Sequence, residues 1–335
     1  MVLVKYIGSI ANDIGRKIMI KIMADSTCDL SQEILDKYDI QMAPLAINID
    51  GKIYKDRVDI KPDDFFAMLP NVEKSPTTSM PSPTDYVSIM KTAVEKGHTS
   101  ILCICMSSGT SASYQSAVIA KDLFYEENPD ITAQVHIVDS KCMSQGSGWL
   151  LVKSARLRDE GASFEELIEF NETYKINVKH FLSVDDLNHL IRSGRITNVS
   201  AFVGKLLKLK PIMTMKQGKG AVVAKERGRK KVLEHYVKEF ANRVDYQLTD
   251  FIIIGYTSEI KVAEDLKRKI KEETDFTGDI FIMQMGVAVG THVGPGAISM
   301  FFAEKDRFDD KVVTDEMKAL LEKKKSFLEK YAIKK

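Results

Sequence analysis

The chain has 335 residues, of which 44% are hydrophobic and 28% are charged. This is the composition of an ordinary globular protein, and the length is enough for about two domains with separate cores. Because 48 Lys and Arg balance 47 Asp and Glu, the chain has no overall positive field that would attract nucleic acid.

The four cysteines, Cys28, Cys103, Cys105 and Cys142, are few and lack the Cys-x-x-Cys spacing of a zinc site or a redox dithiol. They predict reduced thiols, a cytoplasmic location and no metal site. No stretch approaches the roughly 18 to 20 apolar residues of a membrane helix. Residues 1–17 are predicted to be an N-terminal leader without the features of a signal peptide.

The first half of the chain alternates β-rich runs with helical patterns, which predicts an α/β fold with a mostly parallel sheet flanked by helices. Met42 to Tyr54 reads as two strands around Asp50-Gly51, a typical hairpin turn. Ser82, Pro83 and Asp85 predict a capped helix start. We expect strands over Ile18–Ala24, Ser100–Met106 and Val135–Val138, and helices over Ser31–Tyr38, from Pro83 to about Lys96, up to Tyr125 and up to Glu160.

The second half predicts another α/β lobe, with a mixed sheet because two of its strands are joined by a short turn-rich linker, Lys216 to Gly220. Expected strands are His180–Val184, Pro211–Met215, Ala221–Glu226, Phe251–Tyr256 and Ile280–Met285, with helices over Phe164–Lys175, Asp185–Ser193, Lys230–Val244 and Glu259–Glu273 and a loop over Gly286–Gly296. We therefore divide the chain into a leader (1–17), an N-terminal lobe (18–176), a C-terminal lobe (177–309) and a helical extension (310–335).

Two hydroxyl-rich loops precede helices. Thr77, Thr78 and Ser79 form the first loop, and Ser107, Ser108 and Ser111 belong to the second. Helix N-termini present free N–H groups and hydroxyls add neutral donors, so these loops suit a carboxylate or a phosphate. Ser and Thr also cap helices in most proteins, and for either loop alone capping is the simpler interpretation.

Other motifs are less informative. His292 lies in a glycine-rich segment and could donate a hydrogen bond to an acid, although a single histidine is more often structural. That segment lacks the Lys-Ser or Lys-Thr of a Walker loop, and no Gly-x-Ser-x-Gly motif indicates a hydrolase. The carboxylates of Asp185-Asp186 are adjacent and point apart, which disfavours a metal pair. A basic run over 225–231 opposes the dipole of the helix that it begins, which suggests contact with an acidic partner.

Eight motifs in one order resemble the DegV family of bacterial fatty-acid-binding proteins, over about Ile18 to Glu304. Met80 replaces the family's glutamine, and Thr110, Ala112 and Ser113 depart from its second loop. The motifs are ADSTCDL, TTSMPSP, SSGTSASYQSA, VDS, DDLNHLIRSGRI, KPIMTMKQG, RGRKK and THVGPG.

This resemblance implies a two-lobed protein that encloses one long-chain fatty acid and is not itself an enzyme. It implies no cofactor, no metal and no nucleic-acid partner. In the family, a separate ATP-binding subunit of a fatty acid kinase phosphorylates the bound acid, and the acyl phosphate feeds phospholipid synthesis. A transient contact with a membrane surface is consistent with that role.

By motif position, the resemblance also implies the site residues. The residues expected to hold the carboxylate are Thr78, Ser79, Ser107, Ser108, Ser111 and His292, with Arg195 and Gly294 near the head group and Arg227, Arg229 and Lys230 docking the kinase. Two alternatives remain open: a small-molecule phosphotransferase related to the dihydroxyacetone kinases, and a lipid-sensing regulator whose C-terminal helix is the output surface.

Overall fold

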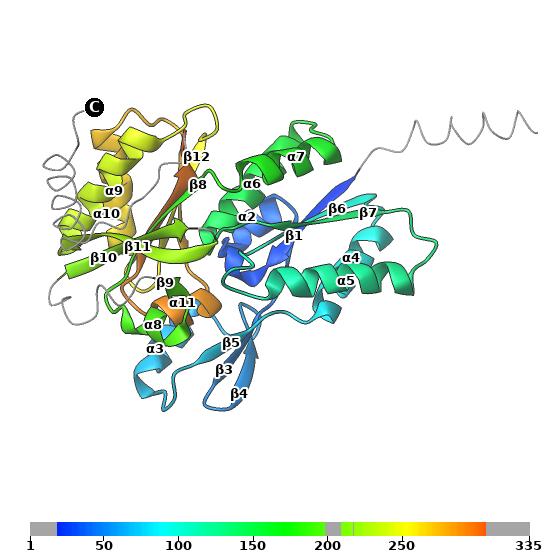
Figure 1. The fold of residues 1–335 in the computed structure, drawn as a ribbon, viewed down its shortest axis with the longest axis horizontal. Coiled ribbons are helices and arrows are strands. Elements are labelled where there is room, and N and C mark those ends of the chain that lie inside the picture. Colours follow the sequence, from blue (N-terminus) through cyan, green and yellow to red (C-terminus); the bar gives the residue numbers. More distant parts are fainter. Residues whose placement is uncertain (1–18, 198–208, 217, 306–335) are drawn as a thin grey trace, which may run out of the picture.

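The computed structural model describes residues 19–197, 209–216 and 218–305, which form two α/β lobes (Figure 1). In the first lobe a parallel four-stranded sheet has the order β2-β1-β6-β7 and carries helices on both faces. Its strands are β1 (Ile20–Asp25), β2 (Ile40–Ala43), β6 (Ser100–Cys105) and β7 (Gln134–Asp139); α2 (Gln32–Lys37), α6 (Gln145–Asp159) and α7 (Phe164–Tyr174) cover one face, and α4 (Pro83–Glu95) and α5 (Ser113–Glu127) the other. The central strands β1 and β6 are buried throughout, as expected for a parallel sheet that helices cover on both faces.

The second lobe contains a seven-stranded mixed sheet in the order β13-β12-β14-β8-β10-β11-β9. Its strands are β8 (Val178–Ser183), β9 (Ile196–Thr197), β10 (Leu209–Lys216), β11 (Lys219–Arg227), β12 (Phe251–Tyr256), β13 (Asp279–Gln284) and β14 (Ile298–Ala303); α9 (Arg229–Arg243) and α10 (Ile260–Glu273) cover one face. The predicted hairpin of β10 and β11 is antiparallel, whereas β12 and β13 are parallel. The predicted fold class, a parallel sheet followed by a mixed one, is therefore confirmed.

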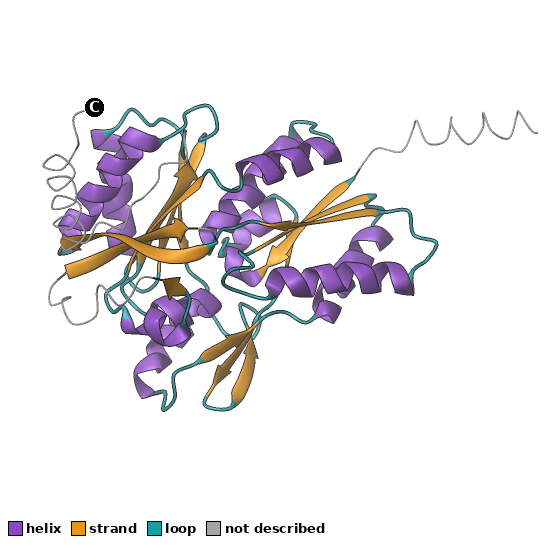
Figure 2. Cartoon of the chain, in the orientation of Figure 1, coloured by secondary structure: helices purple, strands orange, loops and turns teal. Residues whose placement is uncertain are grey.

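A small antiparallel sheet, β4-β3-β5, projects from the first lobe beside the second (Figure 2). Its hairpin turns at Asp50-Gly51, as predicted, with φ of +49° and +90°. The sequence did not reveal the third strand, because three polar residues carry no alternating pattern. The elements here are β3 (Ala46–Ile49), β4 (Lys52–Lys55), β5 (Thr77–Ser79), α3 (Pro62–Met68) and the 3₁₀ turns η1 (Ser26–Cys28) and η2 (Leu69–Asn71).

Helix α6 connects the two lobes. Ten of its residues are buried, and one continuous apolar cluster joins it to strands of both large sheets. A helix that is buried on nearly every side needs no polar stripe, which explains its weak amphipathic pattern. Gly146 permits the close approach to the second lobe, because a Cβ atom there would lie 2.1 Å from Nε2 of His180.

Two sequence predictions in the second lobe were incomplete. The expected loop 286–296 contains the helix α11 (Val287–Val293), and the strand β14 that follows it was not predicted. Glycines and β-branched residues hide the helical pattern, since both have low helix propensity. The expected helix 185–193 is shorter and forms only α8 (Asn188–Ser193).

Both predicted terminal segments, the leader and the helical extension, lie outside the described residues. Within the described ranges, no helix has the length and apolar character needed to cross a membrane.

Candidate functional site

A cavity of about 280 Å³ lies between the small sheet, α11 and the second lobe's large sheet. Its volume is close to the lower end of the range for small-molecule pockets, roughly 300 to 1,000 Å³. Methionine side chains provide much of the wall, and their flexible thioethers adapt to irregular apolar ligands. These methionines are Met80, Met106, Met143, Met213, Met215 and Met285.

The floor of the cavity is one face of the seven-stranded sheet. His180 and Leu182 of β8 lie opposite Phe301 and Ser299 of β14, and all four line the cavity. Alternate residues of a strand face the same side, so this pairing aims four side chains inward. His180, Ser299 and Phe301 are buried, whereas Ser79 and Met80 are exposed, so the cavity extends from a buried floor to an accessible outer end.

A hydroxyl and an imidazole meet at the outer end. Oγ1 of Thr78, on β5, lies 2.7 Å from Nε2 of His292, on α11. Burial, followed by the charge of Arg195, lowers the pKa of His292 to about 4, so its ring is neutral at neutral pH. Ser79 is exposed beside this pair, and Arg195 is partly buried. All four residues line the cavity, so the fold brings together side chains that lie far apart in the sequence.

Two buried carboxyl groups of the first lobe hold the start of α11. Asp29 accepts a hydrogen bond from the backbone N–H of Gly286 at 2.7 Å, and Asp56 accepts one from Val287 at 3.1 Å. Burial raises the pKa of Asp29 to about 7 and that of Asp56 to about 6. Negative charge at a helix N-terminus is favourable, so these contacts fix the helix that carries His292. Sequence analysis missed both roles, although Asp29 belongs to the ADSTCDL motif.

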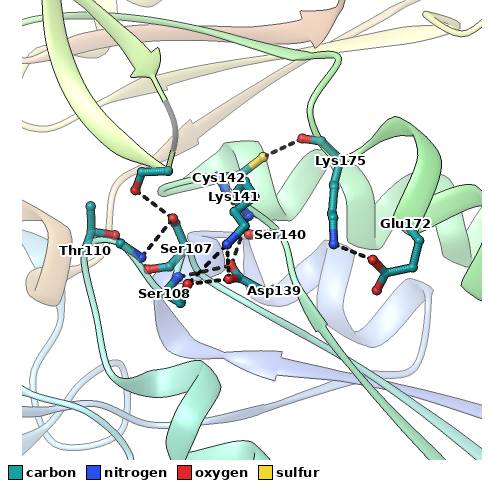
Figure 3. A network of polar contacts seen from close by, with 11 residues as sticks. Ser107, Ser108, Thr110, Asp139, Ser140, Lys141, Cys142, Glu172 and Lys175 are labelled. Carbon is teal, nitrogen blue, oxygen red and sulfur yellow. Dashed lines mark hydrogen bonds and ion pairs between the residues drawn. The ribbon is translucent and has the colours of Figure 1, made fainter.

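The second hydroxyl loop is engaged in contacts with the protein itself (Figure 3). The hydroxyl of Ser108 donates to the carboxylate of Asp139, which also accepts from the Ser108 backbone N–H at 3.0 Å. Although burial opposes it, hydrogen bonds from Lys141 and Ser108 lower the pKa of Asp139. Ser107 donates to the carbonyl oxygen of Gly218 at 2.7 Å. Neither serine lines the cavity.

Ser111 is the residue of this loop that does line the cavity. Its hydroxyl lies 2.9 Å from that of Ser113, at the start of α5. Gly294 ends α11 with φ of +71° and faces His189 instead of the cavity, since a Cβ atom there would lie 2.6 Å from the His189 ring. Of the residues expected near the head group, five line this cavity: Thr78, Ser79, Ser111, Arg195 and His292. Ser107, Ser108 and Gly294 do not line it.

The three residues expected to dock a partner differ in their surroundings. Arg229 is paired with Oδ1 of Asp185 at 2.6 Å and donates to the carbonyl oxygen of Gly296 at 2.7 Å. Arg227 and Lys230 are exposed on either side of it. Arg229 therefore connects the start of α9 to neighbouring loops, while its two neighbours face solvent.

A second cavity of about 320 Å³ lies on the other side of the Arg195 and His292 side chains, which line both cavities. Lys74, His189 and Arg192 contribute to its wall, and so does the carboxylate of Glu73. Burial, together with the charge of Arg192, lowers the pKa of His189. Because Lys74, Arg192 and Arg195 outnumber the single carboxylate, the wall carries a net positive charge that favours an anion. Among the residues that the structure describes, no cluster of three or more His, Cys, Asp or Glu side chains could hold a metal ion.

The family model of the DegV proteins, described as uncharacterised proteins, matches residues 19–305. The chain belongs to the DegV family. A DegV domain-containing protein of Clostridium acetobutylicum is 36% identical over 291 residues, covering 85% of this chain and 99% of that protein. Another, from Caldanaerobacter subterraneus subsp. tengcongensis, is 33% identical over 287 residues and covers 85% of this chain and 99% of its own length.

Solved structures of the family have the same fold. A DegV family protein from Thermus thermophilus, described by its fatty acid binding, superposes with a TM-score of 0.75 at 28% identity and covers 85% of this chain and 100% of its own. A stearic-acid-binding protein from Eubacterium ventriosum gives 0.76 at 28% identity, covering 86% and 99%. DegV from Bacillus subtilis, described as a fatty acid binding protein, gives 0.71 at 26% identity, covering 86% and 100%.

Proposed function

We propose that this DegV family protein encloses one long-chain fatty acid, with the carboxylate at the outer end of the cavity and the tail along its apolar wall. The observation that carries this proposal is the Thr78–His292 pair at the accessible end of a methionine-rich cavity. Relatives of the same fold are described as binding fatty acids, stearic acid among them.

The tail and the head group of the fatty acid contribute differently to the binding free energy. Burying methylene groups contributes roughly 0.8 kcal/mol each, so a sixteen-carbon tail supplies up to about 12 kcal/mol before ordering costs. A carboxylate buried without partners would cost much of that gain. Charge-assisted hydrogen bonds from hydroxyl groups, together with the nearby guanidinium of Arg195, prevent this cost.

The neutral His292 ring orients the first donor. With its proton on Nε2, the ring donates to Oγ1 of Thr78, and the Thr78 hydroxyl then donates to the carboxylate. Ser79 and Ser111 add hydroxyls on the same wall. We assign Ser107 and Ser108 a different role: they hold the second loop in place through Gly218 and Asp139.

We further propose that the protein presents the carboxylate to a separate ATP-binding kinase subunit in the cytoplasm. One carboxylate oxygen attacks the γ-phosphorus of ATP, the bond to the β-phosphate oxygen breaks, and ADP leaves with its charge neutralised in the kinase. The second cavity, whose wall has a net positive charge in spite of Glu73, shares Arg195 and His292 with the first and supports this proposal by offering room for the new phosphoryl group. The exposed Arg227 and Lys230 are the proposed docking contacts, and phospholipid synthesis is the proposed destination.

The binding proposal is tested by mass spectrometry of an organic extract of the purified protein. We expect one long-chain acid per chain. A delipidated sample should take up fluorescently detected long-chain acid with one-to-one stoichiometry, and a protein that binds none would contradict the proposal.

The kinase proposal needs a separate assay. Protein loaded with fatty acid should consume no ATP alone but should yield acyl phosphate, trapped by hydroxylamine as a hydroxamate, when an ATP-binding kinase subunit of the family is added. Turnover of ATP by the protein alone would favour the phosphotransferase alternative.

A further inference from the structure

An unpartnered hydroxyl lies at the buried floor of the cavity. Ser299, on β14, is fully buried and lines the cavity, and its Oγ atom has no hydrogen-bond partner. Leu182 on the neighbouring strand β8 is paired with Ser299 and also lines the cavity. Because paired residues of adjacent strands face the same side of a sheet, both side chains point into the cavity. A buried hydroxyl without a partner is costly, which makes this position a candidate contact for a ligand.

Other polar atoms gather at the same place. A Cβ atom built on Gly255, the neighbour of Ser299 on β12, would lie 2.3 Å from Oε1 of Gln145 and 2.4 Å from Oγ of Ser299. The two oxygens are therefore no farther apart than the sum of these distances, 4.7 Å. Ser144, which also lines the cavity, has its hydroxyl oxygen 2.9 Å from Oε1 of Gln145. The hydroxyl groups of Ser299 and Ser144 therefore line this part of the cavity, whereas Gln145 does not line it.

We propose that this space is a subsite for a hydroxyl group carried by the acyl chain of the ligand, so that the protein accepts hydroxylated long-chain fatty acids. The inference rests on the proposed binding of a fatty acid. A ligand hydroxyl that accepts a hydrogen bond from Ser299 satisfies this buried group.

The charge of the surroundings selects a neutral group. Ser144 donates to Oδ2 of the buried Asp29 at 2.5 Å, so a carboxyl group stands directly behind the subsite. Above the Asp29 pKa of about 7 this group is negatively charged and repels an anionic ligand group, whereas a hydroxyl carries no charge. The same argument fixes the direction of the ligand, with its carboxylate at Thr78 and His292 and its hydroxyl at the floor.

The experiment compares delipidated protein binding stearic acid with its binding of hydroxystearic acids that carry the hydroxyl at successive carbons. Because a neutral hydrogen bond made in place of an unsatisfied group contributes modestly, we expect one isomer to bind roughly two- to tenfold more tightly than stearic acid. The ratio of the two affinities is the readout. Ser299→Ala should reduce this ratio to about one.

Ser183 provides a matched control. It is also fully buried with an unpartnered hydroxyl, but it lies on the opposite face of the neighbouring strand and does not line the cavity. Ser183→Ala should therefore keep the preference for the hydroxylated acid.

The outcomes separate the two proposals. If stearic acid binds and no hydroxylated isomer binds more tightly, water alone occupies the subsite and the inference is wrong. A preference that survives Ser299→Ala would also overturn it. If neither kind of acid binds, the proposed function falls together with the subsite.

Discussion

The two hydroxyl-rich loops contain the same residue types and yet serve different ends in the structure. In the loop that becomes β5, the Thr78 hydroxyl contacts an imidazole on the cavity wall. In the loop after β6, Ser107 and Ser108 are occupied by a backbone carbonyl and by Asp139. The difference teaches that a hydroxyl pattern predicts donors, while the groups facing it decide whether those donors are available to a ligand.

The strongest test of this comparison removes the available hydroxyl. Thr78→Val should weaken fatty acid binding by roughly 10- to 100-fold, because a hydrogen bond to a charged group is lost. Isothermal titration with delipidated protein measures the change. Thr77→Val, its exposed neighbour on β5, is the control and should bind as the unmodified protein does. Equal affinities of the two variants would refute the assignment of Thr78.

A smaller effect is expected from the cation beside the first loop. Arg195→Met should weaken binding about two- to fivefold, since the partly exposed guanidinium is screened by solvent. The same change removes the positive charge that helps lower the pKa of His292, so that pKa should rise. NMR titration of the His292 ring measures the shift. Lys141→Met, next to the second loop, should leave the His292 titration where it was.

The corresponding change in the second loop should affect stability more than binding. Ser108→Ala removes a hydrogen bond to the partly buried Asp139 and should lower the free energy of unfolding by about 1 to 2 kcal/mol. Fatty acid affinity should change less than twofold. Urea unfolding measures the stability, and titration with fatty acid measures the affinity. A large loss of affinity at unchanged stability would show that Ser108 contacts the ligand.

A further contrast concerns the carboxyl groups of Asp29 and Asp139, whose pKa values shift in opposite directions. The pKa of Asp29 is raised from 3.8 to about 7, so the stability it contributes is present at low pH and is lost as pH rises through this window. The pKa of Asp139 is lowered, so its contribution is lost as pH falls below about 4.

Urea unfolding at several pH values tests this contrast. The stability of Asp29→Asn relative to the unmodified protein should increase between pH 4 and pH 7, over the window set by the Asp29 pKa. Asp139→Asn should show its main pH dependence at the acidic end. Parallel curves for the two variants would contradict the opposite shifts.

Much of the fold was predictable because its signals are local. The buried run of β6, the turn at Asp50-Gly51 and the capping box at Ser82 each depend on residues that are close in sequence. β5 and α11 were not predictable in this way. β5 exists because β3 pairs with it, and α11 is held by Asp29 and Asp56 of the other lobe.

The sequence by itself determined the α/β alternation, the family motifs and the types of side chain that could hold an acid, because strand, turn and cap preferences act over a few residues. Only the tertiary structure decided which of those side chains meet. Thr78 reaches His292, Ser108 reaches Asp139 and Ser299 remains without a partner. Hydrogen bonds depend on distance in space, and no local pattern encodes the distance between residues that only the folded core brings together.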